Sequence, residues 1–224
     1  QIWKARNAFC FERTSTTAES IVGKAEEDST SWFHAQTEQS EDQTGLRQGP
    51  ISVERWRPPP WNMIKINVGA SWDGDSMISG AAWINRNAQG QVLSHSRRSY
   101  SGVRSFLKAE LLAMSWAVEA VKNLRLNCVI FEVSSKEVYE LITKSLRGPR
   151  DCLVLNNLRA LLHTAGNYHI TYVHHSLNRV ASEIAASVTR DLRLQSYVAS
   201  GGPCWLMALI NLEAAANGLS SATD

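Results

Sequence analysis

The chain has 224 residues, 44% of them hydrophobic and 20% charged, which suits one ordinary globular domain with flanking segments. No apolar run reaches the ~20 residues of a membrane span, and the charged first residues argue against a secretory signal peptide. The four cysteines form no CxxC pair, so they predict neither a zinc site nor a disulfide framework. We therefore expect a protein of a reducing intracellular compartment, and the initial Gln1 favours a fragment of a longer reading frame or a processed product.

Charge is distributed unevenly along the chain, although the formal net charge is only +2. Residues 1–62 hold 7 basic and 9 acidic residues, whereas residues 63–199 hold 16 basic and 10 acidic ones. A basic central domain behind an acidic leading segment favours a polyanionic partner such as nucleic acid.

The sequence divides into three parts. Residues 1–60 predict a short N-terminal helix and a polar, largely disordered linker that is rich in Ser, Thr, Glu and Gln. The three prolines at 58–60 cannot continue a helix or a central strand, so a domain should begin at residue 61 and extend to about residue 200. The tail, 201–224, contains an apolar segment, Trp205–Ala215, for which a docking helix and disorder remain equally open.

The central part shows a clear succession of elements. Apolar alternation predicts strands, and apolar residues three and four apart predict helices. Ser135 is placed to cap the second of these helices. Three strands in a meander, followed by strands that alternate with helices, indicate a mixed sheet with helices on its faces. The expected strands are 63–70, 78–86, 91–99, 127–133 and 169–173, and the expected helices are 105–124, 135–146, 153–162 and 178–192.

Four motifs follow this order: KINVGA at 65–70, GAAWINRNAQG at 80–90, AEL at 109–111 and NRVASEIA at 178–185. Together they resemble the plant ribonuclease H-like family found at the end of non-LTR retroelement reverse transcriptases. The resemblance implies an α/β ribonuclease H-like fold. Its sheet would be mixed and five-stranded, with the first three strands antiparallel and helices on both faces.

The resemblance also implies a chemistry, hydrolysis of the RNA strand of an RNA–DNA hybrid by two Mg²⁺ ions held by four carboxylates. Carried over position by position, the family's aspartates fall at Gly69, Ser134 and Ser182, and only Glu110 is a carboxylate. Missing anions make Mg²⁺ binding less favourable. We therefore expect no tight Mg²⁺ binding and a catalytically inactive domain. Glu110 is either a remaining metal ligand or a structural group that is hydrogen-bonded to Ser134 or water.

Other residues could replace the missing ligands in an active enzyme. Asp73 follows the first strand, and Glu132 lies two residues before Ser134, so both are candidates for a relocated metal site with Glu110. Glu183 should point elsewhere, because adjacent helical residues differ by ~100° around the axis. His175 occupies a position where the resembled family often has an Arg or a His near the metals, and it could contact phosphate when protonated.

The expected partner is RNA–DNA hybrid or RNA, bound weakly and without sequence specificity through backbone phosphates. A third possibility is a protein-interaction domain that uses the tail as its contact surface. Mg²⁺-dependent hydrolysis would indicate the active enzyme. Salt-sensitive binding without cleavage would indicate the inactive nucleic-acid-binding domain. Absence of nucleic-acid affinity, with self-association that is lost when the tail is removed, would indicate the protein-interaction domain. The candidate phosphate-binding residues are Arg97, Arg98, Arg104, Lys108 and Arg179.

Overall fold

The computed structural model describes residues 17–20, 22, 55–144 and 153–215, and the chain divides into two compact units, Gln1–Ser52 and Val53–Asp224. In the first unit, residues 18–20 are helical. The helix predicted near the N-terminus and most of the polar linker lie outside the described residues. The second unit contains all of the candidate site residues.

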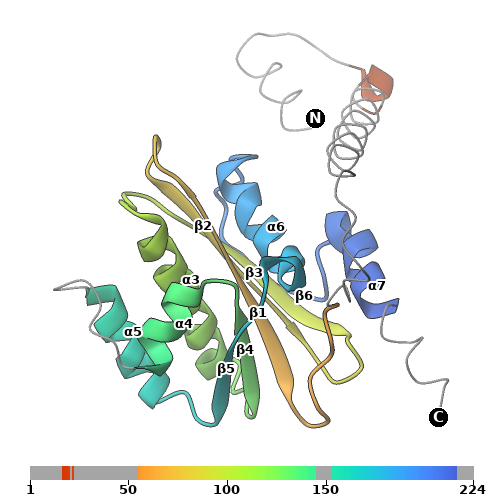
Figure 1. Cartoon of the computed structure of the whole chain (residues 1–224). Coiled ribbons are helices and arrows are strands. Elements are labelled where there is room, and N and C mark those ends of the chain that lie inside the picture. The colour runs from red at the N-terminus through yellow and green to blue at the C-terminus, as the bar shows by residue number, and fades with distance from the viewer. Residues whose placement is uncertain (1–16, 21, 23–54, 145–152, 216–224) are drawn as a thin grey trace, which may run out of the picture. The chain divides into compact units, whose positions relative to one another are not determined.

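The second unit contains a mixed sheet in the order β5-β4-β1-β2-β3-β6 (Figure 1). The first three strands form an antiparallel meander, β4 and β5 run parallel to β1, and β6 pairs antiparallel with β3. The sheet therefore has six strands rather than the five expected. The strands are β1 Ile64–Asp73, β2 Ile78–Arg86, β3 Val92–Tyr100, β4 Val129–Val133, β5 Tyr168–Tyr172 and β6 Tyr197–Ser200.

Helices cover both faces of this sheet, as expected (Figure 1). Helices α3, α4 and α5 pack on one face of the sheet, and helices α6 and α7 lie on the other face. None of the described helices is long and apolar enough to cross a membrane. The helices are α3 Phe106–Asn123, α4 Lys136–Thr143, α5 Leu153–His163, α6 Arg179–Thr189 and α7 Met207–Ala215.

Alternation along β1 decides what each face of the sheet receives. Ile66 and Val68 are buried in the larger apolar core beneath α3. Gly69 and Ser71, at odd-numbered positions farther along the strand, face α6, where the Ser71 hydroxyl donates to the Ala185 carbonyl at 2.7 Å. On β2, a Cβ at Gly80 would lie 2.2 Å from the same Ala185 oxygen. Two glycines therefore let the α6 backbone approach the sheet closely.

The residues after α6 fold back onto the same sheet. Leu206 and Ile210 are buried with residues of β2 and α6 in the second apolar core. The side chain of His95 is hydrogen-bonded to the Gly201 carbonyl at 2.7 Å, and Arg86 forms an ion pair with Glu213 of α7 at 2.6 Å. Part of the Trp205–Ala215 segment is thus a helix docked on its own domain.

Candidate functional site

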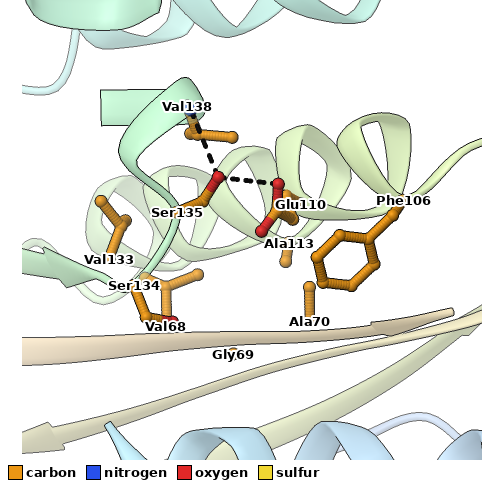
Figure 2. A pocket seen from close by; sticks show the side chains of 10 residues that line it. All are labelled: Val68, Gly69, Ala70, Phe106, Glu110, Ala113, Val133, Ser134, Ser135 and Val138. Carbon is orange, nitrogen blue, oxygen red and sulfur yellow. Dashed lines mark hydrogen bonds between the residues drawn. The ribbon is translucent and has the colours of Figure 1, made fainter. Parts of the chain in front are cut away.

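The residues that the sequence analysis assigned to the family's four carboxylate positions lie together where β4 ends beside the middle of β1. A shallow pocket of about 40 Å³ opens there between α3 and the sheet. Figure 2 shows Glu110 reaching over it from α3, with Gly69 of β1 on the opposite side. The lining residues are Val68, Gly69, Ala70, Phe106, Glu110, Ala113, Val133, Ser134, Ser135 and Val138.

Glu110 is the carboxylate of this pocket. It lies in the second turn of α3, which begins after Ser105, the residue whose hydroxyl caps the helix by accepting from the Lys108 N–H. Its Oε2 accepts a hydrogen bond from the Ser135 hydroxyl at 2.8 Å, and not from Ser134 as expected (Figure 2). Burial raises the pKa of Glu110 above its ordinary value, and nearby Glu137 raises it further, while the Ser135 hydrogen bond opposes the shift.

Ser135 has two roles, because its hydroxyl also accepts from the Val138 N–H and so caps α4, as the sequence predicts. The same hydroxyl donates its single proton to Glu110 and accepts from the helix with one of its two lone pairs. The site carboxylate is therefore fastened to the start of α4.

Gly69 lies at the β1 position that the sequence analysis assigned to the family's first aspartate, and its surroundings leave no room for a side chain. A Cβ at Gly69 would lie 2.3 Å from the Ala181 carbonyl oxygen and 2.7 Å from the Ser182 nitrogen. Both atoms belong to the α6 backbone, which cannot move aside as a flexible side chain could. The helix therefore fills the space into which a β1 carboxylate would project.

The two serines at the remaining positions are joined through Asn178, a residue that is 1% exposed and precedes α6. Asn178 Nδ2 donates to the Val68 carbonyl at 2.6 Å and to the Ser134 hydroxyl at 3.3 Å. The Ser182 hydroxyl donates to the Asn178 carbonyl at 3.0 Å. Sequence reasoning placed Asn178 only at the start of a helix. Its side chain links β1, the end of β4 and α6 behind the pocket.

The proposed substitute carboxylates do not reach the pocket. Asp73 lies four residues beyond Gly69, about 13 Å by strand rise, and is hydrogen-bonded within its own turn to Ser76. Those hydrogen bonds lower the pKa of Asp73. Glu132 is 7% exposed and forms an ion pair with Lys65 at 2.6 Å. Asp73 and Glu132 therefore contact other partners in this structure and are not grouped with Glu110.

The donor set around the pocket does not fit a pair of Mg²⁺ ions. Among the residues that the structure describes, no three His, Cys, Asp or Glu side chains are grouped closely enough to hold a metal ion. The pocket supplies one carboxylate whose pKa is raised, together with neutral serine hydroxyls. Mg²⁺ prefers several hard anionic oxygens, which these residues do not offer.

His175 and Glu183, two further side chains considered for the site, are not among the residues that line the pocket. His175 is exposed in the short 3-10 helix His175–Leu177, with its ring 4.0 Å from that of His174 between centroids. His174 is hydrogen-bonded to Ser176. Glu183 points away from the pocket, as expected, and forms an ion pair with Arg190 at 3.1 Å.

Four of the five candidate phosphate-binding residues present their charge to solvent at least in part. Arg104 and Arg179 are exposed, and Lys108 is half-buried. Arg98 stacks on Trp116 and lies 3.6 Å from Glu119. Arg97 differs from the expectation, because it is 8% exposed and donates to the Ser187 hydroxyl of α6 at 3.2 Å. Its guanidinium stabilises the sheet–helix contact and does not face a ligand.

The sheet order, the helices on both faces and the convergence of these four positions define a ribonuclease H-like domain. A family model described as reverse transcriptase-like matches residues 67–188, which is more than half of the chain. The chain belongs to this family. No curated protein matches it significantly in sequence.

Solved structures support the same fold. RNase H1 from the halophilic archaeon Halobacterium salinarum NRC-1 is similar with a TM-score of 0.51 at 16% identity, covering 58% of this chain and 98% of that one. The N-terminal RNase H domain of rv2228c from Mycobacterium tuberculosis gives the same TM-score and identity over 58% and 94%. LC11-RNase H1 in complex with RNA/DNA hybrid has a TM-score of 0.51 at 15% identity over 58% and 99%.

Proposed function

We propose that this domain binds RNA–DNA hybrid or RNA through its phosphate backbone and does not hydrolyse it. The observation that carries the second half of the proposal is the contact at Gly69. The α6 backbone occupies the space of a β1 carboxylate, since a Cβ there would lie 2.3 Å from the Ala181 oxygen. The missing carboxylate is thus built into the packing of the fold and is more than a change of one side chain.

The electrostatics of the pocket support the same proposal. In the family chemistry, two Mg²⁺ ions clamp the attacking water and the leaving oxygen of a phosphodiester. Here a single carboxylate faces the pocket, and burial already favours its protonated form. Ser134 and Ser182 contribute neutral oxygens that are engaged with Asn178.

The basic residues at the start of α3 support the binding half of the proposal. Arg104 precedes the helix and Lys108 lies in its first turn, which contains no acidic residue. The positive end of the helix dipole adds to their charge. Phe106, which lies between Arg104 and Lys108 in the sequence, lines the pocket together with Glu110, so this end of α3 borders the family site.

A binding experiment tests this surface. Fluorescence anisotropy with a labelled RNA–DNA hybrid should show an affinity that falls steeply with salt concentration. Arg104→Gln/Lys108→Gln should weaken binding and reduce the salt slope by about 2, because two phosphate contacts are removed. The matched control is Lys122→Gln/Arg125→Gln, which removes two exposed charges at the other end of α3. Equal weakening in both variants would contradict the assigned surface.

The finer placement with plant, non-LTR retroelement domains is also our proposal. It is supported by the hairpin motif at 80–90, which spans most of β2 and the turn after it. It is also supported by the NRVASEIA motif at 178–185, which lies in α6 and the residue before it. A reducing intracellular compartment is part of this proposal, and it is consistent with the free thiols of Cys128 and Cys204.

A further inference from the structure

A second and larger pocket lies on the face of the sheet that α6 covers, away from the α3 side. Its volume is about 320 Å³, and it opens between the segment leading into β1 and Leu177, which precedes α6. Figure 1 shows this segment as the orange loop that enters the start of β1. The lining residues are Arg55, Trp56, Arg57, Lys65, Glu132 and Leu177, and none of them belongs to the family site.

The floor of this pocket is a neutralised ion pair. Lys65 Nζ lies 2.6 Å from Glu132 Oε1, and the other carboxylate oxygen accepts from Asn67 Nδ2 at 2.8 Å. Lys65 and Glu132 are 7% exposed each. The negative charge of Glu132 is thereby balanced, so it does not oppose an anion in the space above it.

The rim of the pocket carries two arginines held by a buried tryptophan between them. Trp56 is 3% exposed and donates from Nε1 to the Asn67 side chain at 3.1 Å. Lys65 Nζ lies 5.3 Å from its ring centroid and also donates to the Arg57 carbonyl at 2.6 Å. These contacts fix the backbone that carries Arg55 and Arg57, whose side chains are exposed.

The charge balance of the pocket is therefore +2. Neither Arg55 nor Arg57 has an ion pair with a carboxylate among the residues that the structure describes. Guanidinium groups match the geometry of phosphate oxygens, and two of them match the double charge of a phosphate monoester. The pocket is larger than a lone phosphate requires, and Leu177 offers an apolar wall for the organic part of a ligand.

We propose that Arg55 and Arg57 bind the phosphate monoester of a nucleotide in the pocket above Lys65 and Glu132. The nucleotide is either free or the 5′-phosphorylated end of a strand. This site is separate from the hybrid-binding surface proposed above, because it is built from other residues on the opposite face of the sheet. Its test therefore does not depend on binding or cleavage of hybrids.

Isothermal titration calorimetry on the full chain with adenosine 5′-monophosphate tests the proposal, with adenosine as the uncharged comparison. We expect the monophosphate to bind, adenosine not to bind, and Arg55→Gln/Arg57→Gln to weaken binding at least about tenfold. Lys122→Gln/Arg125→Gln, which removes the same charge elsewhere, should leave the affinity within about twofold. No binding of the monophosphate, equal binding of adenosine, or equal loss in both variants would overturn the proposal.

Binding of single-stranded oligonucleotides with and without a 5′-phosphate distinguishes the two sources of the phosphate. Tighter binding of the phosphorylated strand than of the mononucleotide, lost in Arg55→Gln/Arg57→Gln, indicates a strand end as the ligand. Equal affinity for the two indicates a free nucleotide, and both results support the pocket. Arg104→Gln/Lys108→Gln should keep its affinity for the mononucleotide, which separates this site from the hybrid surface.

Discussion

The two faces of the sheet differ in how their charged side chains are paired. On the α3 side, the pocket at the family site holds one carboxylate, Glu110, with serines around it, and none of the described Lys or Arg side chains forms an ion pair with it. On the other side, Lys65 pairs with Glu132 and Arg86 pairs with Glu213, all of them largely buried. The chain thus places its buried charge where segments are joined to the sheet and not where metal chemistry would need it.

This difference shows what the charged residues of the domain do. A buried ion pair is costly to desolvate, and removing one partner costs more than the pair itself contributes. The pairs on the α6 side connect the segment before β1 and the helix after β6 to the central strands. The family site lacks such pairs, and its packing depends on small residues instead.

The largest expected effect comes from breaking the ion pair that holds α7. Glu213→Ala leaves Arg86, which is 1% exposed, without its carboxylate at 2.6 Å. We expect the free energy of unfolding to fall by about 3 kcal/mol, because a buried cation loses its partner. Chemical denaturation followed by circular dichroism measures this loss.

The control is Glu183→Ala, which removes the solvent-exposed ion pair with Arg190. We expect it to change the free energy of unfolding by less than about 0.5 kcal/mol. Similar losses in Glu213→Ala and Glu183→Ala would show that α7 is not fastened through Arg86.

The next largest effect tests the packing of the family site. Gly69→Ala places a methyl group 2.3 Å from the Ala181 oxygen, so β1 and α6 must separate. We expect a loss of about 2 kcal/mol, as for overpacking a buried contact. Gly74→Ala is the matched variant, because its nearest contact would be the side chain of Trp72 at 3.1 Å and not a helix backbone. A Gly69→Ala protein as stable as Gly74→Ala would remove the steric basis of the proposed inactivity.

A smaller effect is expected at the start of α4. Ser135→Ala removes both the helix cap to Val138 and the hydrogen bond to Glu110. We expect a loss of about 1 kcal/mol in thermal unfolding experiments, which is the usual size for an N-cap. Ser135→Thr keeps the hydroxyl and should recover most of it. Failure of threonine to recover stability would mean that packing, and not the cap, is responsible.

The smallest effect is a pH dependence at Glu110. Because its folded-state pKa is raised, the folded protein binds more protons than the unfolded chain above the ordinary Glu pKa. Its contribution to stability is therefore full below the unfolded pKa and lost as pH rises through the folded pKa. Glu110→Gln should remove this loss and flatten the stability profile over that window.

Glu140→Gln is the comparison of opposite sign. Its hydrogen bond with Lys144 lowers the pKa of Glu140, so its contribution is present above the unfolded pKa and lost as pH falls. Urea unfolding across the acidic range measures both variants. A Glu110→Gln profile that matches the native protein would show that burial does not shift the titration of this carboxyl.

The sequence predicted the strands β1 to β5 and their helices because those segments carry strong periodic patterns. The alternation of Ile66 and Val68 and the helical spacing of Leu111 and Met114 each point to one buried face. β6 was missed because its four residues pair with the edge of β3, a tertiary contact without a local signal. The docking of the tail depends likewise on Arg86, which is distant in sequence.

The candidate site was predictable in its positions but not in its contacts. Gly69, Glu110 and Ser134, which the motif spacing singled out, line one pocket in the structure. It could not show that Ser135 rather than Ser134 binds Glu110, because that depends on where β4 ends and α4 begins. The burial of Arg97 was missed because its partner, Ser187, lies 90 residues away.

The most direct test of the central claim is a paired binding and cleavage assay of the native chain on a labelled RNA–DNA hybrid with Mg²⁺ or Mn²⁺. We predict salt-sensitive binding without cleavage, unchanged in Glu110→Gln. Metal-dependent cleavage by the native chain that is abolished in Glu110→Gln would contradict the account, because it would require a metal site that this arrangement of residues does not provide.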